Sequence, residues 1–553
     1  MSLQLLLLLL MRGATHSSVA ISRGCGRMVS LRGRAICAPV HQRHQQTRAV
    51  CSWMPSPLAP VSTTAAAASV GGGAQSQTLP LQPHLTSSSS SSSPSPAPAQ
   101  QRDSIYALAT APGRAGVAVV RLSGRAAGIA IERMTGSAQK SKTPRQAHLC
   151  RLVHPTTKEH IDDAIVLWFP GPRSFTGEDV AEFHIHGGRS IIEALFEALS
   201  ELPDTRMADA GEFTKRAFFN GKIDLTEVEG LADLINAETR AQRQQALRQL
   251  NGAMSRTFEE WRRTILKSMA HVEGNIDFAE TEDIEENVMQ SAISAVQTLR
   301  HEIAASLNDS RRGERLRSGV SVAIVGAPNV GKSSLLNIMS QRPTAIVSAT
   351  AGTTRDILEV PLDIGGYPLL LCDTAGMRDS DEEIEQEGIK RARARAHACD
   401  LRLCVFDASK LDSVDPSILQ LVQPGMSLPI INKIDTVEAS QLVIPPEILA
   451  AKPVFLSCKS GEGVSVLLER LTLELKQRCE SETGETALIT QWRHRTQLQT
   501  CVAHLDHFLE DLSDVAIAAE HLRQAVRALG QITGRVDIEE ILDVIFRDFC
   551  IGK

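Results

Sequence analysis

The spacing of apolar and polar positions changes several times along the chain, and each change predicts a different kind of structure. Over residues 104–220, short apolar runs predict strands and one longer run has the spacing of a helix. The strands are expected at residues 105–109, 117–122, 161–169 and 180–185, and the helix at residues 191–202. This part of the chain is therefore expected to form an α+β domain.

Helical spacing dominates two other segments. Between about residues 222 and 312, one face of a predicted helix carries Trp261, Ile265, Met269, Val272 and Ile276. After about residue 477 a second apolar stripe appears, and it consists of Leu498, Cys501, Val502, Leu505, Phe508, Leu509 and Leu512. Each stripe predicts a helix that packs against another part of the protein.

The segment between the two stripes, residues 318–476, alternates short β-branched runs with helical stretches. This alternation is typical of an α/β domain with a parallel sheet covered on both faces. Because an apolar stripe must be covered, the two flanking helical segments most simply cover each other. We therefore expect the α/β domain to be inserted into one helical domain, and two separate helical domains are the alternative.

The chain has 553 residues, too many for one compact core, and multidomain organisation is expected. The predicted parts are a transit peptide and linker (1–102), an α+β N-terminal domain (103–220), a helical domain in two pieces (221–315 and 478–553), and an inserted α/β P-loop domain (316–477).

Charge is distributed very unevenly. Residues 1–102 contain eight Arg, no Lys and no acidic residue, whereas residues 103–553 contain 50 basic and 64 acidic side chains, a formal charge of −14. Because residues 103–553 are so acidic, they exclude a function in which the protein coats nucleic acid through its net charge. Any RNA contact must come from a local patch or from a partner. The basic clusters 311–317 and 390–395 are interpreted as solvated helix faces, one of which could face tRNA or a partner protein.

The first hundred residues have the composition of an organellar transit peptide, being rich in Arg and Ser and free of acids. A secretory signal is the rival, since residues 5–11 are apolar, but no positive residue precedes them and a long basic stretch follows. Mitochondrial import, to the matrix, is predicted over plastid import or a plain disordered tail. No later run reaches the roughly 20 apolar residues of a membrane span, so no membrane partner is expected. The eleven Cys include no CxxC pair and indicate a reducing compartment.

A phosphate-binding loop is predicted at residues 326–333, which fit GxxxxGK[ST] directly after an apolar strand at 320–325. Its glycines let backbone N–H groups wrap a β-phosphate, Lys332 supplies a cation to the β and γ oxygens, and the Ser333 hydroxyl can bind Mg²⁺. A helix is expected to open at Ser334.

Four further motifs follow in the order that guanine nucleotide binding requires. Residues 353–356 offer Thr oxygens to Mg²⁺ and the γ-phosphate, and residues 373–376 place a carboxylate and a Gly N–H after the strand at 369–371. Residues 432–435 supply Asp435, whose carboxylate can accept two hydrogen bonds from guanine that adenine cannot offer. Residues 457–459 complete the base pocket. The residues predicted to contact GTP are Asn329, Val330, Gly331, Lys332, Ser333, Ser334, Ser348, Thr353, Thr354, Asp373, Thr374, Ala375, Gly376, Asn432, Lys433, Asp435, Ser457 and Lys459.

The residue after this Asp-Thr-Ala-Gly motif is Met377, where signalling GTPases have a Gln that orients the attacking water. A thioether cannot hold that water, so hydrolysis needs a substitute. Asn329 beside the polar loop 348–354 suggests a bound monovalent cation, and our hypothesis is K⁺ together with dimerisation of the P-loop domain. The charged run 379–387 could supply a carboxylate that orients water, although a solvated face is the simpler interpretation.

Several remaining segments resemble the MnmE family of tRNA-modifying GTPases and their mitochondrial counterparts. They are residues 177–179, 182–188 and 211–217 and the terminal Phe-Cys-Ile-Gly-Lys, residues 549–553. The resemblance covers residues 104–553. It implies a folate-binding, dimerising N-terminal domain, a homodimer whose GTPase domains meet with K⁺, and a flavoprotein partner of the MnmG type. The implied reaction installs an aminomethyl or taurinomethyl group at C5 of the wobble uridine of tRNA, with a one-carbon unit from 5,10-methylenetetrahydrofolate; 5-formyltetrahydrofolate is the other folate implied.

The resemblance also implies roles for individual residues. Arg121, Glu182, Lys222 and Lys553 match folate contacts; Asn329, Ser348, Thr350 and Thr353 match the K⁺ site; Ser333 and Thr354 match Mg²⁺ ligands; Glu385 matches the carboxylate that positions water. Ser348 and Thr350 depart from the usual side chains, and Cys458 replaces the usual Ala. Cys550 is a candidate nucleophile, with a packed tail anchor as the alternative.

Two functions compete at this stage. The first is an enzyme whose GTP cycle drives tRNA uridine modification. The second is a ribosome-assembly GTPase that shares the same nucleotide motifs and performs no chemistry beyond hydrolysis. A ribosome-assembly factor should carry a basic or aromatic RNA-binding module, whereas the appended domains here are acidic and poor in aromatic residues. The sequence therefore favours the modification enzyme.

Overall fold

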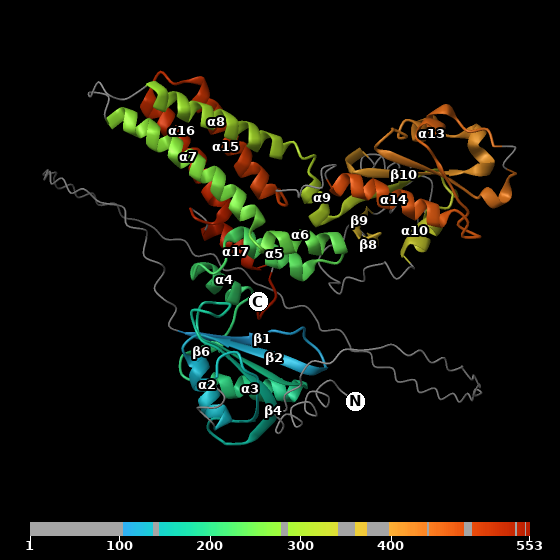
Figure 1. Ribbon diagram of the computed structural model, residues 1–553. Coiled ribbons are helices and arrows are strands. Elements are labelled where there is room, and N and C mark those ends of the chain that lie inside the picture. Colours follow the sequence, from blue (N-terminus) through green and yellow to red (C-terminus); the bar gives the residue numbers. More distant parts are fainter. Residues whose placement is uncertain are drawn as a thin grey trace, which may run out of the picture. The chain divides into compact units, whose positions relative to one another are not determined.

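The computed structural model describes residues 103–136, 143–277, 286–340, 360–372, 397–438, 442–480, 489–536, 539–547 and 549–553. The predicted transit peptide lies outside these residues. Helices and strands appear where the apolar patterns predict them, and the α+β, all-α and P-loop α/β classes are all present (Figure 1).

The first sheet domain, residues 104–219, has six strands in the order β3-β4-β5-β2-β1-β6. Its strands are β1 (Ser104–Leu108), β2 (Ala115–Ser123), β3 (His148–Val153), β4 (His160–Phe169), β5 (Val180–Gly187) and β6 (Thr205–Met207), and its helices are α2 (Ala126–Thr135), α3 (Arg189–Ser200) and α4 (Glu212–Phe219). Alternate residues of β5, including Phe183 and Ile185, are buried in a core shared with α2 and α3. The opposite parity of β5 carries Glu182 and His184, so polar chemistry is confined to the other face of the sheet.

The second sheet domain, residues 320–479, has the strand order β12-β11-β10-β7-β9-β8. Its strands are β7 (Val320–Val325), β8 (Val360–Ile364), β9 (Tyr367–Cys372), β10 (Leu401–Asp407), β11 (Ser427–Asn432) and β12 (Val454–Phe455), and its helices are α10 (Lys332–Ser340), α12 (Pro416–Leu419), α13 (Pro446–Ala450) and α14 (Val464–Cys479), with short 3₁₀ turns η1 (Ala408–Ser413) and η2 (Ile434–Thr436). All pairs are parallel except β8 with β9. The predicted parallel sheet is therefore confirmed.

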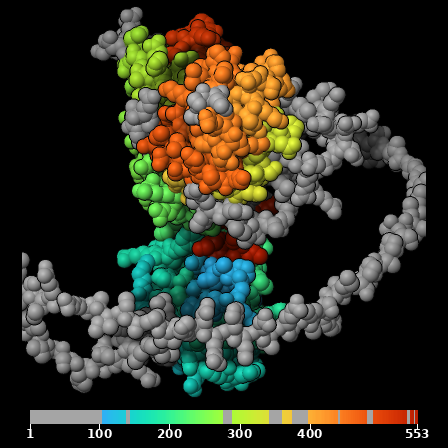
Figure 2. Space-filling view, turned by 90° about the vertical axis from the view of Figure 1, so that its right-hand side faces the viewer, coloured from blue at the N-terminus to red at the C-terminus, as the bar shows by residue number. Residues whose placement is uncertain are grey.

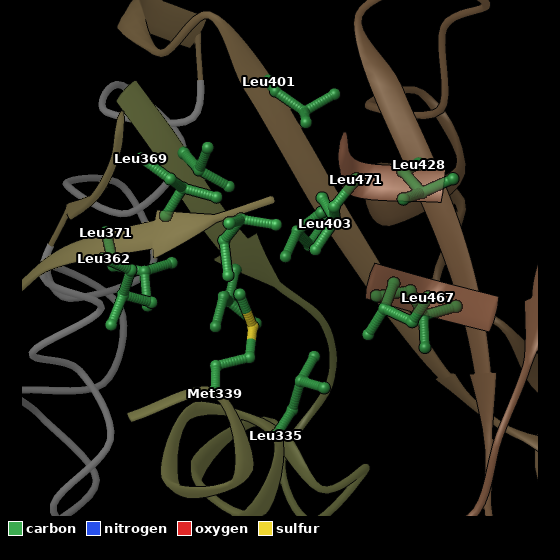
Figure 3. Close-up of a cluster of buried hydrophobic side chains, with 14 of the residues drawn as sticks. Leu335, Met339, Leu362, Leu369, Leu371, Leu401, Leu403, Leu428, Leu467 and Leu471 are labelled. Carbon is green, nitrogen blue, oxygen red and sulfur yellow. The ribbon is translucent and has the colours of Figure 1, made fainter. Parts of the chain in front are cut away.

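Buried leucines fill the space between this sheet and two helices on one face (Figure 3). Leu335 and Met339 come from α10, and Leu467 and Leu471 from α14, and they meet strand residues such as Leu403. Because β7 is central and fully packed, the loop at its carboxyl end starts from a rigid base.

The remaining helices form the third part. They are α5 (Leu225–Asn236), α6 (Arg240–Leu250), α7 (Ala253–Asp277), α8 (Glu286–Leu307), α9 (Arg312–Ser318), α15 (Trp492–Glu510), α16 (Val515–Thr533) and α17 (Glu539–Arg547). One core unites the two helical segments, with Phe258, Trp261 and Ile265 from the first and Leu498, Leu505, Phe508 and Leu522 from the second. The green and red surfaces of this bundle accordingly lie side by side (Figure 2). The second sheet domain is thus an insertion into one helical bundle, and the alternative of two helical domains is wrong.

None of the described helices is long and apolar enough to cross a membrane.

Candidate functional site

The loop between β7 and α10 has the backbone of a phosphate cradle. Asn329 has a φ of 62° and Gly331 a φ of 103°, so the chain turns sharply just before the helix begins at Lys332. Ser333 and Ser334 are exposed in the first turn of α10, where N–H groups are free of helical partners and favour an anion. The Ser333 hydroxyl is therefore open to Mg²⁺, whose preference for oxygen ligands it fits.

Lys332 is bent over this loop, and its Nζ donates to the carbonyl oxygen of Ala327 at 2.7 Å. Burial lowers the pKa of the Lys332 ammonium. A carbonyl is a weak partner for a partly buried cation, and phosphate oxygens in the cradle would replace it with a charged one.

The Asn-Lys-Ile-Asp segment, at the end of β11, holds the cradle in place. Asn432 is buried, and its Nδ2 donates to the carbonyl oxygen of Val330 at 2.8 Å. Lys433, with a φ of 65°, donates from Nζ to the carbonyl oxygen of Asn329 at 2.7 Å. Two side chains far along the sequence thus fix successive parts of the phosphate loop.

The base pocket is assembled from the ends of β11 and β12. The exposed Asp435 carboxylate accepts a hydrogen bond from the Ser457 hydroxyl, with Oγ to Oδ1 at 2.6 Å. The Cys458 N–H donates to Asn432 Oδ1 at 3.0 Å, and the Lys459 N–H donates to Ser457 Oγ at 3.2 Å. Asp435 is consequently held in one orientation, with its other lone pairs available for two N–H donors of a guanine ring. Cys458 fits the position through its backbone.

The structure adds Asp407, at the end of β10, which the sequence interpretation missed. Its Oδ2 accepts a bond from Lys433 Nζ at 2.7 Å. Burial alone would raise the pKa of Asp407, but hydrogen bonds from Lys433 and Ser409 outweigh burial and lower it. An acidic residue directly after the apolar run 403–406 was the signal that could have revealed Asp407.

Several predicted nucleotide and metal residues lie outside the described residues. They are Ser348, Thr350, Thr353, Thr354, Asp373, Thr374, Ala375, Gly376, Met377 and Glu385. Their roles remain predictions.

A second polar group lies on the first sheet domain. Arg121 on β2 donates from Nε to Glu182 Oε1 on β5 at 2.9 Å, and Nη2 lies 2.9 Å from the same oxygen in an ion pair. Its guanidinium lies 5.8 Å from the ring centroids of Phe175 and Phe213. Burial would raise the pKa of Glu182, but bonds and charge from His184 and Arg121 lower it. The pair is therefore an ionised, half-buried group flanked by aromatic rings.

Lys222 and the C-terminal tail approach the same region. Lys222 Nζ donates to the carbonyl oxygen of Pro172 at 3.0 Å, in the loop that also carries Phe175. Ile551 forms a β-bridge with Ala210, and Gly552, with a φ of 96°, lies against Leu108; a Cβ there would come within 2.2 Å of the Leu108 carbonyl oxygen. The β1 residue next to Leu108 is Ala107, which pairs with Arg121. The tail therefore passes one residue from the β1 partner of Arg121, and Cys550 is exposed.

Three features together define a P-loop GTPase. They are a parallel sheet that ends in a phosphate-binding loop, an Asn-Lys-x-Asp segment hydrogen-bonded to that loop, and an aspartate that accepts a hydrogen bond from a serine. Comparison with known proteins narrows the class. The sequence family of the MnmE helical domain matches residues 225–550, and the family of the N-terminus of GTP-binding protein TrmE matches residues 104–222.

Relatives match across almost their whole length. The mitochondrial "5-taurinomethyluridine-[tRNA] synthase subunit GTPB3" of Danio rerio is 50% identical over 469 residues, which cover 82% of this chain and 93% of the relative. The human protein of the same name is 46% identical, with 81% and 93% covered. The "tRNA modification GTPase MnmE" of Paramagnetospirillum magneticum is 49% identical, with 82% and 100% covered. The chain belongs to the MnmE family.

Proposed function

We propose that this protein is the GTP-hydrolysing subunit of a complex that modifies C5 of the wobble uridine (U34) of mitochondrial tRNAs with a taurinomethyl or aminomethyl group. The main support is that Asn432 and Asp435 are held as guanine recognition requires, in a chain that is 50% identical to a relative named as a mitochondrial taurinomethyluridine synthase subunit. The basic leader of residues 1–102 supports import, and the mitochondrial matrix is the proposed compartment.

A reduced folate is the proposed one-carbon donor, as 5,10-methylene- or 5-formyltetrahydrofolate, with Arg121, Glu182, Lys222 and Lys553 as its contacts. Phe175, which is 38% exposed beside Arg121, suits a flat heteroaromatic ring, and the two lysines suit the anionic glutamate tail. Glu182 can accept hydrogen bonds from ring N–H groups because its pKa is lowered. Cys550, an exposed residue of the C-terminal tail, is the proposed nucleophile.

The protein is further proposed to act as a homodimer with a flavoprotein partner of the MnmG type. Because Met377 stands where signalling GTPases have a glutamine, the attacking water needs another partner, and Glu385 is proposed to orient it. K⁺ is proposed to supply the missing positive charge, held by Asn329, Ser348, Thr350 and Thr353. Mg²⁺ is proposed to bind to Ser333 and Thr354. In support of the K⁺ site, Asn329 belongs to the phosphate loop, where its carbonyl oxygen accepts a hydrogen bond from Lys433.

GTP turnover is expected to be at least about tenfold faster in KCl than in NaCl at the same ionic strength, because oxygen ligands spaced for K⁺ coordinate the smaller Na⁺ poorly and so supply less positive charge to the proposed site. Steady-state phosphate release measures the rates, and CsCl serves as a control for general salt effects. Equal rates in all three salts would defeat the cation proposal.

Mass spectrometry of wobble uridines in organellar tRNA tests the whole proposal. Cells that lack this protein are expected to lose the C5 group, and the wild-type chain is expected to restore it. Gly552→Ala should fail to restore it while hydrolysing GTP normally, since a Cβ at a φ of 96° within 2.2 Å of the Leu108 carbonyl oxygen displaces the tail.

Gly136→Ala is the matched control, because Gly136 has a φ of 64° and nothing within 4 Å of the added carbon. Unmodified uridines in wild-type cells would contradict the proposed function. Full modification with Cys550→Ser would exclude a chemical role for that thiol while leaving the rest standing.

A further inference from the structure

The predicted basic cluster at 311–317 is not an open cationic surface. Arg315 Nε lies 2.7 Å from Asp400 Oδ1, Arg317 Nε lies 2.7 Å from Asp233 Oδ1, and Arg311 pairs with Glu314. These arginines are engaged by carboxylates of the chain itself. A local patch for a polyanion, which the acidic body makes necessary, must therefore be sought elsewhere.

A different segment has the required composition. Between Glu238 and Glu259 the sequence runs for twenty residues without an acidic side chain and contains four arginines. They are Arg240, Arg243, Arg248 and Arg256. Most of this segment is α6, and no acidic residue lies within the helix.

The inward face of α6 is held by two glutamine side chains, of which Gln249 is buried. Gln249 Nε2 donates to the Thr226 carbonyl oxygen at 2.9 Å, and its Oε1 accepts from the Thr490 hydroxyl at 3.2 Å. Gln242 completes a capping box with Thr239 and also donates from Nε2 to the Arg317 carbonyl oxygen at 3.0 Å. The helix therefore cannot roll, and its outward side chains keep a constant direction.

The outward face carries Arg240, Arg243, Gln244, Leu247 and Arg248, all exposed. In the part of the chain that the structure describes, neither Arg240 nor Arg243 forms an ion pair. Arginines on other helices do so, as the half-buried Arg300 with Asp506 and the exposed Arg523 with Glu273. Unpaired guanidiniums on a rigid helix are suited to bidentate contacts with phosphate groups.

An exposed aromatic ring lies close to α6. Trp492 is 70% exposed, whereas the other described tryptophans, Trp168 and Trp261, are 8% and 6% exposed. Trp492 follows Thr490, which contacts Gln249, by two residues, which is at most about 7 Å of chain. An indole exposed to water offers a stacking surface for an unpaired base.

We propose that the outward face of α6, with Trp492, is a docking surface for tRNA. The arginines contact the phosphate backbone, and the indole stacks on an unpaired base. This inference rests on the proposed function, which supplies the tRNA. Arg240 to Arg248 span about 12 Å along the helix, enough for contacts to more than one phosphate.

Labelled tRNA binding to the full-length protein tests the surface. Arg240→Gln/Arg243→Gln is expected to weaken binding about tenfold at low salt and to reduce the slope of log affinity against log salt by about 1.4 to 1.8, the loss of two phosphate contacts. Arg300→Gln/Arg523→Gln, which removes two arginines that are paired within the chain, should bind like the wild type. Both variants should hydrolyse GTP at the wild-type rate, because none of these residues lies in the nucleotide site.

Tryptophan emission gives a second readout. tRNA should quench the wild-type emission, and Trp492→Phe should lose that quenching. Wild-type binding by Arg240→Gln/Arg243→Gln, or no binding by the wild type, would overturn the surface, and an equal loss of heparin and tRNA binding would overturn its assignment to RNA. These assays use purified components, so they fail or succeed separately from the wobble-uridine measurement, which tests the proposed function itself.

Discussion

Asp435→Asn is expected to lower GTP affinity at least about 100-fold, because the carboxamide turns an N–H donor toward the guanine donors that the carboxylate accepts. Ser457 holds Asp435 through a 2.6 Å bond, so the side chain cannot swing away to relieve the conflict. The same amide should improve binding of xanthosine triphosphate, which has a carbonyl in place of the guanine amino group. Titration calorimetry with GTP and with xanthosine triphosphate measures both affinities.

Asp412→Asn is the matched control for Asp435. Asp412 is an exposed aspartate of the same domain, in η1, and its amide should leave both affinities unchanged. GTP affinity retained by Asp435→Asn, or a wild-type preference for ATP over GTP, would mean that the base is recognised elsewhere.

Gly331→Ala is expected to weaken GTP binding severely while the domain stays folded. A Cβ at Gly331 would come within 2.2 Å of Asn432 Nδ2, and the φ of 103° is one that alanine rarely adopts. Relief requires the Asn432 bond to Val330 to break, which deforms the phosphate cradle. We expect affinity to fall at least about 100-fold, since strain of this kind costs roughly 1 to 3 kcal/mol before the lost bond is added.

Thermal melting with and without GTP separates binding from folding. A ligand at 100 times its dissociation constant stabilises the wild type by about 2.7 kcal/mol, and Gly331→Ala should lose that increment. Gly425→Ala should keep it, because Gly425 has a φ of 80° but no atom within 4 Å of the added carbon. A GTP-dependent rise in the melting temperature of Gly331→Ala would contradict the role of this close approach.

The fold was predictable because its signals are local or periodic. The stripe that includes Leu498 and Leu505 needed a cover, and Phe258 and Trp261 of the first helical segment supply it. The phosphate loop was predictable from its spacing alone. These predictions use the geometry of one helix or one strand end, which the chain carries within a few residues.

What the sequence could not reveal depends on contacts between distant residues. Lys433 forms hydrogen bonds to both Asn329 and Asp407 and so links the ends of three strands. No local sequence pattern indicates these two bonds. Likewise, Arg317 looks like a solvated cation until Asp233 is found beside it. The position of a charged side chain depends on a partner that can lie far away in the sequence, whereas the burial of an apolar side chain can be predicted from the local spacing of apolar residues.

The insertion of the nucleotide domain also shapes how the protein is made. The apolar side of α7 and α8 leaves the ribosome or the import channel well before α15 and α16, which complete its core. During that interval the nucleotide domain can fold alone, while the early helices must wait with their leucines and aromatics exposed. Chaperone dependence should therefore be greatest for nascent chains that end between residues 307 and 492, and premature stop codons in that stretch should yield aggregation and proteolysis instead of a working fragment.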